Sequence, residues 1–275
     1  MPEAGLIDCH LHILDPARFP YHPQAPYHPE GAEVGTLAQL RAVFAAHGVE
    51  RALLVQPTSG YFTDNSALLE AIAQSGGLWR GIAMVSPDMS SEDLAVLKAQ
   101  GVAGVACMMA MGPVDVPAWC AMASRLADLD MVLDIQFAGE GIFDALPIIA
   151  ASPAQVVIDH CGRPDLDAGL DAPAFRALLG LAARERTAIK ISGQHKFAPF
   201  PWPFEAADPF IGALIAAFGP ERCVWGSDWP FLRVPERVDY GPLRPLVERY
   251  FPDETARRQV LRDTALQLFW GNSQL

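Results

Sequence analysis

The stretch VVIDH at residues 156–160 is an apolar run that ends in an acidic residue and a histidine. Seven further short runs rich in Val, Ile, Leu and Met recur along the chain, and a stretch with helical apolar spacing follows each of them. Short apolar runs that alternate with helices are typical of buried parallel strands. The eight expected strands are 6–10, 51–56, 80–85, 102–108, 131–136, 156–160, 188–192 and 223–227.

The expected helices alternate strictly with these strands, and several begin at Thr, Asp or Ser, which cap helix N-termini. An open doubly wound sheet alternates in the same way, but only a closed barrel requires eight equivalent units. We therefore expect an α/β fold, a (β/α)8 TIM barrel that forms a single domain over residues 1–275. The expected helices lie near 36–47, 64–75, 90–100, 115–129, 140–151, 171–185, 205–218 and 253–269.

The overall composition narrows the classes of function. Of the 275 residues, 51% are hydrophobic and 19% are charged, which supports a large buried core. The net charge of −12 repels phosphate backbones and anionic lipids, so we expect neither a nucleic acid nor a membrane as a partner. Five cysteines without C-x-x-C spacing suit a reduced, cytoplasmic protein. The oligomeric state is left open.

Two histidines stand where the first expected strand ends. His10 and His12 are two residues apart, so both side chains lie on the same face of an extended chain. Neutral imidazoles bind divalent ions, and protonated ones donate hydrogen bonds to an oxyanion. By itself an H-x-H pair also occurs by chance at surfaces and in turns.

Two further polar residues end other strands at the same level. His160 closes the stretch 156–160, and Asp228 directly follows the last expected strand. Because barrel active sites form at the C-terminal ends of the strands, we expect these two residues to meet the histidine pair at one mouth. Each also has a structural interpretation, His160 as a hydrogen-bonded core histidine and Asp228 as a helix cap. The set of four favours a reaction centre.

Other polar residues near the strand ends have two interpretations each. Asp8 and Asp159 could fix the ring tautomers of the neighbouring histidines, or could accept hydrogen bonds from backbone amides. Arg163 could clamp a substrate carboxylate through paired N–H groups, or could form a salt bridge with Asp165 at the rim. Lys196 occupies a comparable loop position after the seventh expected strand.

Three segments carry a resemblance to a known family: IDCHLH at 7–12, VIDHCGRPD at 157–165 and VWGSDWP at 224–230. They resemble the amidohydrolase-2 branch of the amidohydrolase superfamily, in particular its 2-pyrone-4,6-dicarboxylate lactonases and related lactonases. The likeness runs from about residue 6 to Trp270 and covers nearly the whole chain.

The resemblance implies roles for individual residues. In these lactonases the aspartate of strand 8 is the general base for water, and histidines from strands 1 and 6 polarise the carbonyl. The implied catalytic residues are Asp228, His10, His12 and His160. The residues that match substrate contacts of the family are Tyr27, Thr58, Arg163 and Lys196. Lys196 stands where the family has an arginine, so a bidentate contact becomes a point charge.

The sequence departs from the family on strands 4 and 5. An arginine near the end of strand 4 has no counterpart in Val105–Met109, which is apolar and rich in sulfur, so we expect an anionic lactone with one carboxylate. The Lys or Glu and the His that bridge two metals in many amidohydrolases are missing as well. We expect either no required cofactor or one divalent ion, Zn or Mn, on His10, His12 and Asp228.

The preferred hypothesis is hydrolysis of a small, carboxylated lactone, of the kind found in aromatic catabolism or among sugar acids. Asp228 would activate water while the histidines polarise the carbonyl. One alternative is a metal-dependent decarboxylase of the same superfamily. Another is a non-catalytic barrel that binds a small molecule.

Overall fold

The computed structural model describes residues 5–25, 27–109 and 112–271, and in it eight strands form one parallel sheet in the order of the sequence. All eight expected strands are present, with ends that differ from the prediction by a residue or two. The strands are β1 (Leu6–Leu11), β2 (Val49–Val55), β3 (Trp79–Ala83), β4 (Val102–Met108), β5 (Val132–Gln136), β6 (Val156–Ile158), β7 (Thr187–Ile191) and β8 (Cys223–Trp225).

Backbone hydrogen bonds join β1 to the segment that follows β8. The His12 N–H donates to the Trp229 carbonyl at 2.9 Å, and the Asp228 N–H donates to the His10 carbonyl at 2.7 Å. These bonds complete the ring of strands, so the sheet is a TIM barrel, as the alternation of strands and helices predicts. They also place His10 beside Asp228.

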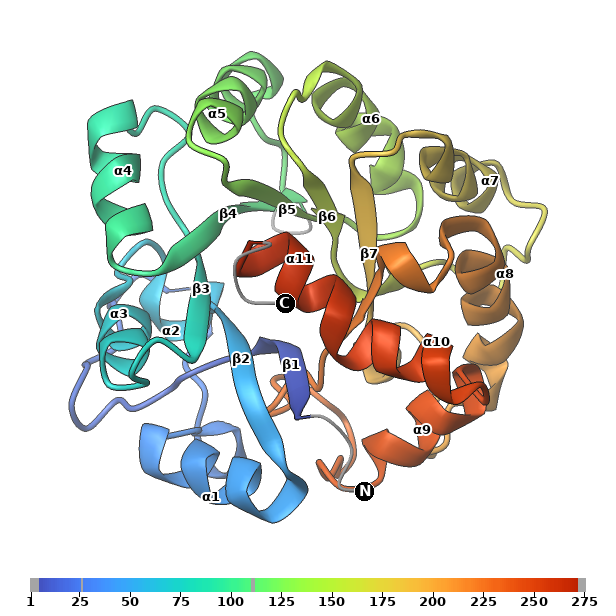
Figure 1. The fold of residues 1–275 in the computed structure, drawn as a ribbon, viewed down its shortest axis with the longest axis horizontal. Helices are drawn as coiled ribbons and strands as arrows, with labels where there is room; N and C mark the ends of the chain where they lie inside the picture. Colours follow the sequence, from blue (N-terminus) through green and yellow to red (C-terminus); the bar gives the residue numbers. More distant parts are fainter. Residues whose placement is uncertain (1–4, 26, 110–111, 272–275) are drawn as a thin grey trace.

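A ring of helices surrounds the barrel (Figure 1). The first of them begins after Thr36, whose side chain and that of Gln39 form a capping box, and it ends before Gly48, which has a φ of 68°. The helices of the ring are α1 (Leu37–His47), α3 (Ser66–Ala73), α4 (Ser91–Ala99), α5 (Val116–Asp128), α6 (Ile142–Ala151), α7 (Pro173–Gly180) and α8 (Asp208–Phe218). Among the described residues, no helix is long and apolar enough to cross a membrane.

The C-terminal region differs from the single helix expected at 253–269. It consists of α10 (Glu254–Arg258), a π-helical turn at Gln259–Asp263 and α11 (Thr264–Phe269). An unexpected helix, α9 (Leu243–Tyr250), precedes it, and its Pro245 is tolerated because it lies in the first turn. The short segment α2 (Thr58–Tyr61) follows β2 and was also not predicted, and its Ser59 and Gly60 have non-helical backbone angles.

Helix α11 crosses one end of the barrel in Figure 1. Its Leu266 and Phe269 pack into a buried cluster with Ile7, Leu53 and other inward-facing strand residues. Burial of this apolar surface closes the end where the strands begin. The opposite end, where the strands finish, carries the polar residues.

Candidate active site

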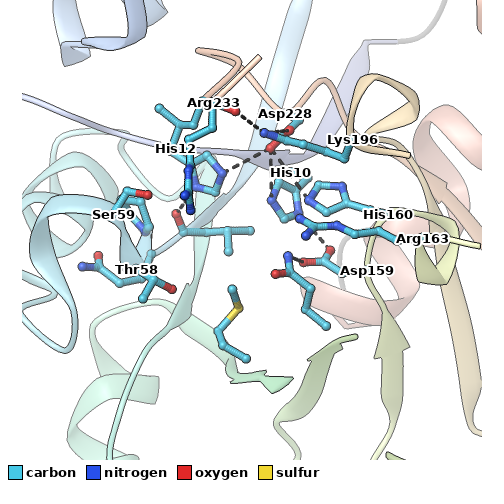
Figure 2. Close-up of a pocket in the computed structure, with 16 residues that line it drawn as sticks. His10, His12, Thr58, Ser59, Asp159, His160, Arg163, Lys196, Asp228 and Arg233 are labelled. Atoms are coloured by element: carbon cyan, nitrogen blue, oxygen red, sulfur yellow. Dashed lines mark hydrogen bonds and ion pairs between the residues drawn. The ribbon is translucent and has the colours of Figure 1, made fainter. Parts of the chain in front are cut away.

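A cavity of about 280 Å³ opens where the strands end (Figure 2). Its size suits a small molecule. Every site residue predicted from the sequence lines the cavity except Tyr27. Asp159, a candidate for fixing a histidine tautomer, also lines it, as do Gln136 and Arg233, which were not assigned to the site in advance.

Asp228 stands at the centre of the site and is 1% exposed. Its Oδ1 lies 3.3 Å from His12 Nε2, 3.6 Å from His10 Nε2 and 3.9 Å from His160 Nε2. Its Oδ2 lies 2.8 Å from His195 Nε2 and 3.2 Å from Lys196 Nζ. One oxygen is therefore anchored, while the other faces the three imidazoles that the sequence predicted.

The surroundings of Asp228 keep it ionised. Burial acts to raise the pKa of this carboxyl, but the positive charge of Lys196 and a hydrogen bond from His195 outweigh burial. The pKa of Asp228 is consequently held well below its usual value. At neutral pH the residue is a carboxylate that can accept a proton.

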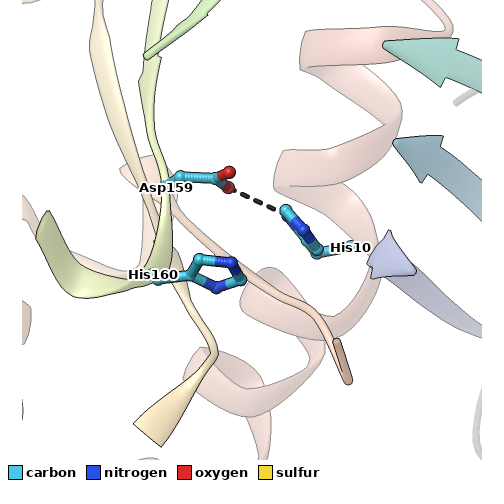
Figure 3. Close-up of side chains that lie close together, drawn as sticks. All are labelled: His10, Asp159 and His160. Carbon is cyan, nitrogen blue, oxygen red and sulfur yellow. Dashed lines mark hydrogen bonds and ion pairs between the residues drawn. The ribbon is translucent and has the colours of Figure 1, made fainter. Parts of the chain in front are cut away.

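The two histidines of β1 are oriented through their Nδ1 atoms. Nδ1 of His12 lies 2.8 Å from the Val55 carbonyl oxygen, which can only accept, so this nitrogen carries a hydrogen. Nδ1 of His10 lies 2.9 Å from Asp159 Oδ1 (Figure 3). Burial lowers the pKa of His10 to about 4, so its ring is neutral at pH 7. Both rings therefore turn Nε2 towards Asp228.

His160 is held differently, because its Nδ1 lies 3.1 Å from the Ser192 hydroxyl. Burial lowers the pKa of His160 well below its usual value. When the hydroxyl donates to Nδ1, the remaining hydrogen of the neutral ring lies on Nε2 and points into the cavity. Gly193 makes room for this ring, since a Cβ there would lie 2.3 Å from His160 Nδ1.

The backbone around the catalytic set is tightly constrained. Gly226 is needed because a Cβ at this position would lie 2.6 Å from the Cβ of His10. His160 and Asp228 have φ values of 46° and 63°, in the left-handed region that non-glycine residues rarely occupy. Such strained conformations concentrate at functional sites, where the surrounding structure enforces them.

A buried ionic network that the sequence analysis missed lies beneath His10. Lys190 of β7 is fully buried, forms an ion pair with Asp134 of β5, and lies 2.9 Å from Asp159 Oδ1. Gln136 donates to the other oxygen of Asp159 at 3.3 Å. The charged residues within the apolar stretches 131–136 and 188–192 were the available signal.

Of the two proposed tautomer-fixing acids, only Asp159 contacts a histidine ring. Asp8 accepts hydrogen bonds from the backbone N–H groups of His10 and Ser227 and from the Tyr240 hydroxyl. The second interpretation, a buried carboxylate bonded to backbone amides, therefore describes Asp8. Burial raises its pKa to about 6.

The predicted substrate residues differ in whether their polar groups already have partners in the protein. The Thr58 hydroxyl lies 3.5 Å from Met84 Sδ, and Lys196 also donates to the Leu232 carbonyl oxygen in addition to its contact with Asp228. Arg163 forms no ion pair with Asp165 in the described ranges, and its buried Nε has no hydrogen-bond partner there. The Tyr27 hydroxyl donates a hydrogen bond to Glu33, and Tyr27 lies outside the cavity lining.

The residues that could hold a metal are His10, His12 and Asp228, whose ligand atoms lie within 4.8 Å of one another. The donor set fits a divalent ion, because Nδ1 of both rings is engaged elsewhere and both Nε2 atoms face the same carboxylate oxygen. His10, Asp159 and His160 form a second such group (Figure 3). In that group Asp159 is already bound to Lys190.

Comparison with known proteins agrees with this geometry. A 4-sulfomuconolactone hydrolase from Rhizobium radiobacter is 32% identical over 273 residues, which cover 96% of this chain and 90% of the relative. A 2-pyrone-4,6-dicarboxylate hydrolase from Comamonas testosteroni is 28% identical, with 97% and 90% coverage. The structure of a probable 2-pyrone-4,6-dicarboxylic acid hydrolase from Acinetobacter baumannii, with citric acid bound, superposes with a TM-score of 0.88 at 25% identity, covering 97% of this chain and 100% of that one.

The amidohydrolase family model Amidohydro_2 matches residues 7–270, which is nearly the whole chain. The two relatives named above match over about 90% of their length and are hydrolases of lactones by name, and a D-galactarolactone isomerase from Agrobacterium fabrum matches as well, at 29% identity with 96% and 91% coverage. The chain therefore belongs to the amidohydrolase family Amidohydro_2, and it is a lactonase-like hydrolase.

Proposed function

We propose that the protein hydrolyses a small lactone that carries a carboxylate, with water activated by Asp228. The observation that carries this proposal is the asymmetry of the Asp228 carboxylate. His195 and Lys196 hold Oδ2, whereas Oδ1 faces the cavity among three imidazoles. A buried base with one fixed oxygen and one free oxygen suits the removal of a proton from a water molecule.

The histidines take two different parts in this proposal. His10 and His12 present Nε2 lone pairs beside Oδ1, so one of them can accept the second hydrogen of the water whose first hydrogen Asp228 takes, and this orients the water. His160 presents Nε2–H when Ser192 donates to its Nδ1, and this group can donate to the lactone carbonyl. Attack of the water oxygen on that carbonyl forms a tetrahedral oxyanion, which His160 stabilises.

Ring opening completes the reaction. The bond between the carbonyl carbon and the ring oxygen breaks, and the proton held by Asp228 passes to the departing alkoxide or enolate. The product is an open-chain acid with one additional carboxylate. The base is regenerated in its ionised form, which Lys196 favours.

A single divalent ion, Zn or Mn, fits the same site on His10, His12 and Asp228. When bound, such an ion would lower the pKa of a bound water and polarise a carbonyl. The tautomers of His10 and His12 are those that metal ligation requires, since Asp159 and Val55 engage their Nδ1 atoms.

We propose that the substrate carries a carboxylate because Arg163 is available to bind one. This side chain lines the cavity, and no carboxylate of the described chain lies within ion-pair distance of it. A guanidinium in this position can bind a carboxylate through two N–H groups. The names of the two lactone hydrolases above also denote acidic substrates. The compound itself, from aromatic catabolism or from a sugar acid, is left to experiment.

A panel of aromatic-catabolic and sugar-acid lactones with a pH indicator tests the proposal, because each ring opening releases a proton. The panel should be run with and without a chelator, and each product should be tested for release of carbon dioxide. We expect an acid to form from at least one carboxylated lactone. Carbon dioxide release without ring opening would favour the decarboxylase, and binding without turnover would favour a non-catalytic barrel.

A further inference from the structure

Three cationic side chains line the cavity, and they differ in whether a carboxylate neutralises them. Lys196 lies 3.2 Å from Asp228, whose carboxylate neutralises it. Arg163 and Arg233 form no ion pair with any carboxylate in the parts of the chain that the structure describes. An uncompensated cation at a cavity wall attracts an anionic group of a ligand.

Arg233 comes from the loop after β8, lines the cavity (Figure 2) and is exposed, so it lies at the cavity mouth. Its guanidinium carbon lies 5.1 Å from the centre of the Tyr27 ring, a cation–π contact. Glu33 accepts two hydrogen bonds, one from the Tyr27 hydroxyl at Oε2 and one from the backbone N–H of Arg233 at Oε1. Tyr27 and Glu33 therefore hold Arg233 in place.

These contacts leave the hydrogen-bonding capacity of Arg233 unused. Within the described chain, no acceptor lies within hydrogen-bond distance of its guanidinium N–H groups, because Glu33 engages only its backbone. The arginine also has a φ of 56°, in the region that favours glycine or asparagine. An exposed arginine that its neighbours hold, and whose donors have no partner in the described chain, can bind an anionic ligand at the cavity mouth.

We propose that Arg233 is a specificity-determining residue that binds a second carboxylate of the lactone, at the mouth of the cavity. Tyr27 and Glu33 are positioning residues that act through Arg233. This inference rests on the proposed function and extends it from one carboxylate to two. The absence of an arginine on strand 4 led us to expect a single carboxylate, but Arg233 supplies a cation from the loop after β8.

The positions of the two arginines support a lactone with two acidic groups. Arg163 follows β6 and Arg233 follows β8, so the two arginines approach the cavity from different strands. The histidines and Asp228 come from the same part of the barrel, on or after β6, β8 and β1. On strand 4, Met108 lines the cavity and offers no charge. A substrate held at both acidic groups would have its ring fixed over the catalytic set, which raises the rate of attack.

The test compares two lactones with the same ring, one with a single carboxylate and one with two. The matched variants are Arg233→Gln and Arg237→Gln, since Arg237 lies in the same loop, is 85% exposed and pairs with Asp239. The ratio of kcat/KM for the two-acid lactone to that for the one-acid lactone should fall roughly 10- to 100-fold in Arg233→Gln, mainly through KM. Arg237→Gln should keep the wild-type ratio.

Variants of the two positioning residues separate support of Arg233 from direct contact with substrate. Tyr27→Leu and Glu33→Gln should lower the same ratio by smaller factors, because Arg233 remains present but is less well held. In the double variant Tyr27→Leu with Arg233→Gln, the Tyr27 change should add little. Equal losses on both lactones in Tyr27→Leu would show instead that Tyr27 contacts the lactone ring.

The outcomes for Arg233 and for the proposed function are distinct. If the wild type opens these lactones but Arg233→Gln keeps the wild-type ratio, the role of Arg233 is overturned and the proposed function stands. The same conclusion follows if the wild type opens only the one-acid lactone. If the wild type opens no lactone of any kind, the proposed function fails and this inference fails with it.

Discussion

The floor and the mouth of the cavity differ in how their charges are compensated. In the floor, Lys190 pairs with Asp134 and Asp159, and Asp159 also binds His10. On the rest of the cavity lining, from the wall to the mouth, neither Arg163 nor Arg233 has an acidic partner among the residues that the structure describes. The floor is a closed network, whereas the mouth has cationic groups left to bind a ligand.

This difference separates two tasks within one barrel. Charges that are already paired gain little from a ligand, but they fix the orientation of the rings above them. Unpaired cations near solvent gain from an anionic ligand and can change during evolution without disturbing the buried network. We infer that the floor determines the reaction and the mouth determines which lactone enters.

The largest expected effect comes from the residue above the floor. Asp228→Asn keeps the shape of the side chain but removes the base, so kcat should fall by about 10²–10⁴-fold or more. Circular dichroism and thermal unfolding should show that the fold persists. Asp167→Asn is a matched control, because Asp167 is exposed in the loop after β6. Near-normal turnover in Asp228→Asn would remove this residue from the mechanism.

Substitutions in the floor should mainly lower the free energy of unfolding. Lys190→Met leaves Asp134 and Asp159 buried without their cation, which should lower the free energy of unfolding by about 3–5 kcal/mol. Urea denaturation measures this change, and Lys98→Met on an exposed helix position serves as the control. Adding Asp134→Asn should restore part of the loss. Wild-type stability in Lys190→Met would contradict the view of the floor as a charge-paired unit.

Substitution of an unpaired arginine of the cavity should change which lactones are hydrolysed and leave the stability of the fold unchanged. Arg163→Ala should cost about 2–4 kcal/mol in kcat/KM for a carboxylated lactone, mostly as a raised KM. A neutral lactone should be almost indifferent to the change. Kinetics with one anionic and one neutral lactone measure both effects. Equal losses on the two substrates would mean that Arg163 supports its loop and does not bind the substrate.

The sequence predicted the framework well because its signals are periodic or lie at strand ends. Eight apolar runs predicted the barrel, and His10, His12, His160 and Asp228 were predicted to meet because each ends a strand. These four side chains do meet around one carboxylate oxygen. Helix α9 was missed because its proline concealed the apolar spacing.

The remaining site residues gave weaker signals. Lys190 and Asp134 were missed because one charged residue within an apolar strand does not reveal its partner on another strand. Arg233 lies in an irregular loop, where no periodicity predicts which side chains face the cavity. Tyr27 was assigned to substrate by resemblance, and its contact with Arg233 was not foreseen. Contacts between distant loops depend on the folded chain and were not predictable from spacing.

The central claim is that Asp228 activates a water molecule that opens the lactone. A single turnover in water enriched in the heavy oxygen isotope, with enzyme in excess over lactone and analysis by mass spectrometry, tests it most directly. We expect one heavy oxygen atom in the new carboxylate of the product and none in the protein. Heavy oxygen in the Asp228 side chain would show instead that this carboxylate attacks the lactone itself, and an unlabelled isomer of the lactone would show that no hydrolysis takes place.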